Sequence, residues 1–365
     1  MAAPWPEPHP PAADKLPLLQ VLRALAAGMV VLAHAWDNYI NKLDPQTQMP
    51  SSFAFGLFGV QVFFAISGFI MVQSAASLPQ GWASFKHFFL RRLIRIVPLY
   101  WAVTLVYAAK LHLQGQGPSG AELLASLLFW PYAEPGTSLM RPVLGVGWTL
   151  NFEMLFYALL SLAMLIAPAW RFYAVGLLLL ALSVSRHLGW VSLDSEGASA
   201  LYLWADDILL YFVLGTCLAH LWARSRQRRS AWLSLPWAVV GLVAGLVGMV
   251  AAQTLGLWAE GSPLWAAGPV SMALLWCSVA NHGQWQGRWA QGLQRRLVLA
   301  GDGSYSTYLI HGFLLGLMAR FFTATAWPVG LWGFSLLALV VCTVAGVLSY
   351  RWFELPVTQR LKRWL

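Results

Sequence analysis

The sequence predicts an all-α, polytopic integral membrane protein with about ten transmembrane helices and both termini in the cytoplasm. Of its 365 residues, 59% are hydrophobic and only 10% are charged, whereas soluble domains are about 45–50% apolar and about 25% charged. Apolar runs of roughly the 20 residues that cross a bilayer recur along the chain. Basic residues collect in every second connection between these runs. Together these observations exclude a cytosolic enzyme, a secreted disulfide scaffold and a nucleic-acid-binding domain.

Three regions are predicted along the chain. Residues 1–15 form a disordered N-terminal tail, because the first fourteen hold five Pro and no Lys or Arg, unlike a signal peptide. Residues 16–355 form the transmembrane domain, and 356–365 form a basic cytoplasmic tail. The segment 121–132 is too short to span the bilayer and is expected at the outer interface or as a re-entrant segment.

Ten apolar runs, each bounded by basic or by Pro- and Gly-rich breaks, are the candidate spans. In chain order they are 16–36, 53–73, 96–113, 143–167, 172–189, 201–222, 232–252, 264–281, 297–319 and 329–350.

The distribution of Lys and Arg orients these spans. With the N-terminus in the cytoplasm, seventeen of the 23 basic residues lie in inside segments. Five lie outside, namely Lys42, Lys110, Arg141, Arg186 and Arg320. Such a bias follows the positive-inside rule and predicts a multi-pass protein of the cell (inner) membrane. The net charge of +9 therefore reflects topology and implies no nucleic-acid partner.

Four ionisable residues fall within the predicted spans, and each is a functional candidate because a charge at bilayer depth is costly. They are Arg23, His34, Glu153 and His311. Arg23 and His34 lie eleven residues apart, so they share one face of a helix with about 16 Å between them. The alternative is a snorkelling Arg and an interfacial His. Glu153 requires a cationic or His partner, or it is protonated and bonded to a neighbouring helix.

The segment GDGSYSTYLIHGF (301–313) carries a polar stripe. On a helix Ser304, Tyr308 and His311 follow i, i+4 and i+7, so they face the interior of the bundle and indicate a lined cavity. A packing His bonded to a backbone carbonyl remains an equal alternative for His311.

A basic cluster precedes the third span. In FKHFFLRRLIRIVPLYW (85–101), helical spacing gathers Arg91, Arg92 and Arg95 on one side. Guanidinium groups bind phosphates bidentately, although any cytoplasmic connection of this topology is basic.

Other familiar chemistry is missing from the sequence. It has no GxSxG, GxxxxGK[ST] or HExxH motif and no paired Cys/His spacing, so no metal is expected. Ser67 in AISGF is interpreted as a helix-packing residue. Asp206 and Asp207 are candidates for sugar hydrogen bonds, with an ordinary wet helix end as the favoured alternative.

These blocks, taken in order, resemble the membrane-bound acyltransferase-3 family. LPLLQVLRALAAGMVVLAHAW resembles its opening helix with Arg-x10-His, and RRLIRIVPLYW its Arg-x-x-Arg block. GWTLNFEMLFYAL, SYSTYLIH and SYRWFELPVTQRL resemble its later blocks. The sequence Leu-Asn-Phe-Glu at 150–153 is most similar to that of the exopolysaccharide-production O-acetyltransferase branch. Met154 stands where others carry a second acid, and Gln20 where Asp is common.

The resemblance implies an O-acyltransferase that moves an acyl group, usually acetyl, from cytoplasmic acyl-CoA to a hydroxyl of a surface carbohydrate. We expect Arg91, Arg92 and Arg95 to hold the CoA phosphates, with Ser304 and Tyr308 along the path of the pantetheine arm.

Catalytic roles are expected for the four intramembrane residues. His34 acts as general base or carries the acyl group, and Glu153 orients it. Arg23 and His311 stabilise the developing oxyanion or position the thioester. The rival hypothesis is a glycolipid or polysaccharide transporter or flippase that uses the same charges as a relay.

Overall fold

The computed structural model describes residues 16–47, 52–132, 141–192, 199–228, 247, 264–280 and 288–365. Within these ranges the chain is helical and contains no strand. Seven of its helical segments are long and apolar enough to cross a membrane. They are Pro17–Lys42, Phe55–Ala75, Trp82–Leu113, Gly145–Leu165, Asp207–Ser225, Ser304–Thr325 and Leu331–Lys362. The protein is therefore a polytopic helical membrane protein.

The first two predicted spans, 16–36 and 53–73, correspond to α1 (Pro17–Lys42) and α2 (Ser52–Ala75). The third, α3 (Trp82–Leu113), begins fourteen residues before the predicted 96–113. The basic cluster is therefore part of this helix, not of the connection before it. After α4 (Gly120–Leu127), which starts with a capping box at Ser119, the chain forms α5 (Trp148–Leu162) and α6 (Arg171–His187).

The predicted span 201–222 is interrupted in the structure. It divides into α7 (Ser199–Trp204), a 3-10 turn (Asp207–Leu209) and α8 (Leu210–Arg228). The break occurs because the Asp206 carboxylate accepts a hydrogen bond from Ile208 N (2.9 Å) and caps a new helical start.

Beyond that, 264–281 corresponds to α10 (Leu264–Ala280), while 232–252 lies outside the described residues apart from Val247. The predicted 297–319 is also divided, at Gly303, into α11 (Arg288–Asp302) and α12 (Ser304–Thr325). The chain ends with α13 (Leu331–Ser349), a π-helix (Tyr350–Glu354) and α14 (Leu355–Lys362).

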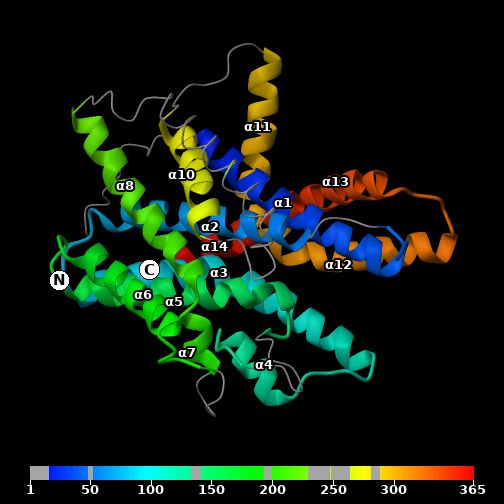
Figure 1. Cartoon of the computed structure of the whole chain (residues 1–365), viewed down its shortest axis with the longest axis horizontal. Coiled ribbons are helices and arrows are strands. Elements are labelled where there is room, and N and C mark those ends of the chain that lie inside the picture. The colour runs from blue at the N-terminus through cyan, green and yellow to red at the C-terminus, as the bar shows by residue number, and fades with distance from the viewer. Residues whose placement is uncertain are drawn as a thin grey trace.

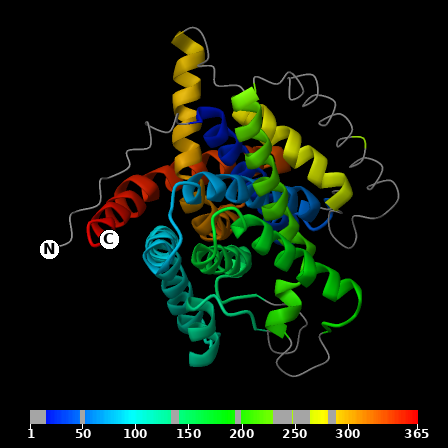
Figure 2. The same cartoon turned by 90° about the vertical axis from the view of Figure 1, so that its left-hand side faces the viewer.

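The helices α2, α3, α12 and α13 run mainly along the longest axis of the molecule, while α8, α10 and α11 run across it (Figure 1). The C-terminal ends of α1, α3 and α12 lie at one end of this axis, on the right in Figure 1. The helices α1 and α2 pack together, and α1 also contacts α11, α12 and α13. Viewed toward the other end, α3 and α5 are neighbours below α2 (Figure 2).

Two glycines bring α2 and α8 into close contact. A Cβ atom on Gly68 would lie 2.2 Å from the Phe212 carbonyl oxygen, and one on Gly215 would lie 2.0 Å from that of Ala65. Small residues allow helix backbones to approach in this way inside a membrane. The packing interpretation of the AISGF segment is thus confirmed for Gly68.

The two Asp residues near the end of α6 are engaged by protein partners. Asp206 pairs with Arg186 (2.7 Å), while Asp207 pairs with His187 (2.9 Å) and accepts a hydrogen bond from Ser183 (2.5 Å). These contacts tie α6 to the start of α8.

Candidate active site

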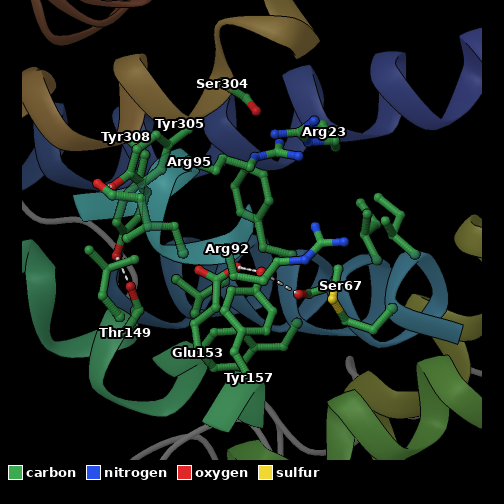
Figure 3. Close-up of a pocket in the computed structure, with 18 residues that line it drawn as sticks. Arg23, Ser67, Arg92, Arg95, Thr149, Glu153, Tyr157, Ser304, Tyr305 and Tyr308 are labelled. Atoms are coloured by element: carbon green, nitrogen blue, oxygen red, sulfur yellow. Dashed lines mark hydrogen bonds between the residues drawn. The ribbon is translucent and has the colours of Figure 1, made fainter. Parts of the chain in front are cut away.

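A cavity opens among α1, α2, α3, α5 and α12 (Figure 3). Its volume, measured as the space open to the centre of a water molecule, is about 90 Å³. Its polar lining comes from all five helices, and its apolar lining mainly from α2. The polar side chains are Arg23, Ser67, Arg92, Arg95, Thr149, Glu153, Tyr157, Ser304, Tyr305 and Tyr308.

Three arginines give this cavity its charge. Arg23 is buried and donates to Gln20 Oε1 on its own helix (3.1 Å). The Arg92 guanidinium lies over the rings of Phe88 (5.1 Å) and Tyr157 (5.9 Å), and Arg95 completes the group. None of the three belongs to an ion pair in the described part of the chain. Guanidinium groups without a carboxylate partner are suited to binding an anion.

The predicted cluster of Arg91, Arg92 and Arg95 is divided by the structure. Arg91 is exposed, is outside the cavity lining, and makes a hydrogen bond to the His87 ring (3.2 Å). Arg92 and Arg95 point into the cavity together with Arg23, which lies on a different helix. Helical spacing predicted the first cluster, but the Arg23 contribution depends on how α1 packs.

Glu153 does not make the expected contact with His34. Its carboxylate accepts a hydrogen bond from Tyr157 Oη. Because that hydroxyl has a single hydrogen, Ser67 Oγ donates in turn to Tyr157 Oη (3.1 Å). The partner differs because α5 packs against α3 and α6, whereas α1 lies across the cavity. The expected orientation of His34 by Glu153 is corrected accordingly.

His34 instead contacts His311. The two ring centroids are 4.9 Å apart in an edge-to-face arrangement. His311 is fully buried, and its Nδ1 lies 2.6 Å from the Tyr308 carbonyl oxygen. A carbonyl can only accept, so Nδ1 carries the hydrogen and Nε2 of the neutral ring is a bare acceptor. This Nε2 is buried and has no hydrogen-bond partner among the residues that the structure describes.

The predicted polar stripe of α12 is buried as expected. Ser304 and His311 are fully buried, and Tyr308 is 8% exposed. Tyr308 Oη donates to the Val146 carbonyl (2.9 Å) and lies 2.9 Å from Thr149 Oγ1. Ser304 and Tyr308 reach the cavity, whereas His311 lies beyond it against His34. The alternative for His311, a bond to a backbone carbonyl, is also present in the structure, and it fixes the ring.

Several polar residues of this region were not among the predicted site residues. Glu354, in the π-helix, is buried, accepts a hydrogen bond from Ser306 Oγ (2.7 Å), and is within electrostatic reach of Arg23 and Arg95. Tyr305 lines the cavity and donates to the Ile96 carbonyl (2.8 Å). Glu354 belongs to the SYRWFELPVTQRL block, and the resemblance of this block to the family was the one feature of the sequence that could have indicated a role for it.

Comparison with known proteins identifies the family. The sequence model described as an acyltransferase domain (Acyl_transf_3) matches residues 17–351. The chain belongs to the acyltransferase-3 family. This acyltransferase is 31% identical to "Exopolysaccharide production protein ExoZ" of Rhizobium meliloti (strain 1021) over 320 residues, covering 84% of this chain and 91% of the relative.

A second relative is "Nodulation protein 10" of Rhizobium leguminosarum bv. viciae. It is 29% identical over 172 residues, which cover 41% of this chain and 45% of the relative. No solved structure matches the acyltransferase. Family membership implies an acyl donor, and in the described residues no group of three or more His, Cys, Asp or Glu side chains is placed to hold a metal ion.

Proposed function

We propose that this acyltransferase moves an acyl group, most simply acetyl, from cytoplasmic acyl-CoA to a hydroxyl of a surface carbohydrate such as exopolysaccharide. The name of the ExoZ relative supports the acceptor class. The proposal places the protein in the cell (inner) membrane with about ten spans and both termini in the cytoplasm. The cavity then opens toward the acyl-CoA side, because it lies near the start of α1.

One observation carries the proposal. Tyr308 lines the cavity, its ring lies 5.9 Å from that of His311, and His311 in turn lies 4.9 Å from His34. A path of ring contacts from Tyr308 through His311 to His34 therefore links the arginine-lined cavity to a pair of imidazoles. Such a path suits a phosphorylated donor bound at one end and a hydroxyl activated at the other.

The donor end of this path is the arginine group. Arg92 and Arg95 hold the phosphates of CoA, while the exposed Arg91 adds positive charge outside the cavity. Ser304 and Tyr308 line the narrow space for the pantetheine arm. Glu153, bonded by Tyr157, lies within electrostatic reach of Arg92 and balances its charge. It therefore acts as a positioning residue for the donor site.

The acyl transfer uses the histidines. His34 takes the proton of the acceptor hydroxyl as its oxygen attacks the thioester carbonyl carbon. Arg23, on the same face of α1 as His34, stabilises the developing oxyanion, and His311 positions the His34 ring through their edge-to-face contact. The C–S bond then breaks, the CoA thiolate leaves, and the proton on His34 restores the thiol. In the alternative sequence His34 attacks first and carries the acyl group.

The first experiment substitutes the proposed base. His34→Ala should lower acyl transfer by about 10²- to 10⁴-fold, the usual contribution of general acid–base catalysis. A matched control is His220→Ala, since His220 is also half-buried in a helix but contacts Phe172 and the Thr216 carbonyl. If the His34→Ala protein is made at the normal level and acylates at the wild-type rate, His34 is not the catalytic base.

The second experiment tests the donor site by equilibrium binding of acetyl-CoA to the purified protein. The pair Arg92→Ala plus Arg95→Ala should weaken binding by at least tenfold, since hydrogen bonds to charged groups contribute about 1.5–3 kcal/mol each. The pair Arg295→Ala plus Arg296→Ala on the exposed face of α11 removes the same charge elsewhere. If the two double variants bind acetyl-CoA with equal affinity, Arg92 and Arg95 do not bind the donor, and their charge reflects membrane topology alone.

Reconstituted vesicles separate acyl transfer from the transport hypothesis. Acetyl-CoA is supplied on one side, and acylated carbohydrate is measured on both sides by mass spectrometry. The proposal expects a mass increase of one acetyl group that depends on acetyl-CoA. Movement of unmodified carbohydrate without any donor would favour the transporter.

A further inference from the structure

Three basic residues gather at the end of the bundle opposite the cavity. Lys42 ends α1, Lys110 lies in the last turn of α3, and Arg320 lies near the end of α12 (Figure 1). Lys42 is within electrostatic reach of both Lys110 and Arg320. Like charges held together are unfavourable unless an anion neutralises them. The positive-inside rule provides no reason for them, because it places cations at the other end.

None of these three cations belongs to an ion pair within the described ranges of the chain. The pairs there join Arg186 to Asp206 and His187 to Asp207. Two acids of the described residues lie near this end of α1. Asp44 accepts hydrogen bonds from Gln46 N (3.2 Å) and Thr47 Oγ1 (2.6 Å), and Asp37 interacts with His34.

A ladder of hydrogen bonds places Lys42 on the His34 face of α1. Lys42 Nζ donates to Asn38 Oδ1 (2.6 Å), and Asn38 Nδ2 donates to the His34 carbonyl (2.8 Å). The three residues are spaced i, i+4 and i+8, which spans about 12 Å along the helix. Lys42 therefore lies above the proposed base, on the side from which an acceptor approaches it. His34 is also within electrostatic reach of the exposed Arg141.

Lys110 adds aromatic surface to this site. Its ammonium lies 5.2 Å from the ring centroid of Tyr107 and 5.8 Å from that of Phe313. The two rings meet edge to face at 5.3 Å and are half-buried, and they join α3 to α12. A cation beside accessible aromatic rings offers both charge and an apolar face to a ligand.

We propose that Lys42, Lys110 and Arg320 bind carboxylate or other acid groups of the carbohydrate acceptor. The inference rests on the proposed function, which supplies a carbohydrate acceptor at this end. An acidic saccharide is favoured over a lipid headgroup because the ladder places the exposed Lys42 on the face of α1 that carries His34, the proposed base. His34 and His311 then lie between two cationic sites, one for the donor and one for the acceptor.

The test measures binding of tetragalacturonate and of uncharged cellotetraose to the full-length protein in an uncharged detergent. Tetragalacturonate should bind more tightly, and added salt should weaken its binding because exposed charges are screened. Exposed ion pairs contribute about 1.4- to 5-fold each. The triple variant Lys42→Gln, Lys110→Gln and Arg320→Gln should therefore lose about 3- to 100-fold in affinity for tetragalacturonate.

Two single variants serve as controls. Lys86→Gln removes a lysine that lies over the Trp82 ring (5.9 Å) at the other end of the bundle, and Arg186→Gln removes a cation already paired with Asp206. Both should keep the wild-type affinity for tetragalacturonate. Equal affinity of the wild-type protein for both sugars, or no loss in the triple variant, would overturn the proposal.

Two further results distinguish the sources of failure. If phosphatidylglycerol vesicles bind through these cations and tetragalacturonate does not, the site is a lipid contact and the proposal is overturned. If tetragalacturonate binds as expected while acetyl-CoA transfer fails with every carbohydrate, the anion site stands and the proposed function fails.

Discussion

At Gly301 the backbone of α11 lies directly against that of α1. A Cβ atom added there would lie 2.0 Å from the Gln20 carbonyl oxygen and 2.9 Å from Gln20 Cα. Real Cβ atoms essentially never come closer than 3.0 Å to another heavy atom. Gly301→Ala must therefore separate the two helices by about 1 Å. Gln20 is also the acceptor for the Arg23 guanidinium, so the displacement reaches the cavity.

The expected cost has two parts. Overpacking typically destabilises by about 1–3 kcal/mol, against which the better helix propensity of Ala returns up to about 1 kcal/mol. A misplacement of about 1 Å at a positioned group lowers the rate of acyl transfer by about 10²-fold. We therefore expect a modest decrease in thermal stability and a large decrease in activity.

Gly292→Ala is the matched control, since Gly292 lies on the same helix with no neighbouring atom within 4 Å of the added Cβ. It should gain about 0.5–1 kcal/mol of stability and keep full activity. The assays are thermal unfolding in detergent and acetyl transfer from acetyl-CoA. If Gly301→Ala matches Gly292→Ala in both, the reasoning from close packing to Arg23 is wrong.

Two further predictions concern carboxylates. Glu354→Gln keeps the hydrogen bond from Ser306 but removes the negative charge near the cavity arginines. The rate of acyl transfer should fall about tenfold, roughly 1.4 kcal/mol, with little change in the thermal midpoint. An unchanged rate would contradict a role for this charge. Hydrogen bonds from Ser119 hold the pKa of Glu122 below its ordinary 4.5, so this group stabilises the start of α4 above that pH and the effect is lost as pH falls through the lowered pKa. Hydrogen exchange of α4 should show this acid-dependent loosening in the wild type and not in Glu122→Gln.

The sequence was sufficient for the class of fold and for most long helices, because hydropathy directly reports burial in lipid. It placed the helix breaks less well. Gly303 and Asp206 interrupt apolar runs through backbone geometry and capping, to which a hydropathy window is insensitive. The early start of α3 was missed for the opposite reason, since three Arg lower the hydropathy of a continuous helix.

Prediction of the site followed the same division. Residues related by helical spacing, such as Ser304, Tyr308 and His311, were correctly predicted to share a buried face. Partners on different helices could not be predicted, because spacing carries no information about which helices are neighbours. The Glu153–Tyr157 bond and the His34–His311 contact both depend on that choice.

The π-helix between α13 and α14 makes the chain sensitive to its length as well as to its composition. A π-turn accommodates one residue more than an α-turn, and each residue of a regular helix advances the side chains by about 100°. Glu354 is the last residue of this wide turn. Shortening the turn by one residue would rotate its carboxylate away from Ser306 although every functional side chain was retained. A sequence comparison that scores only matching residues would overlook this loss, since the information is held in the count of residues between them.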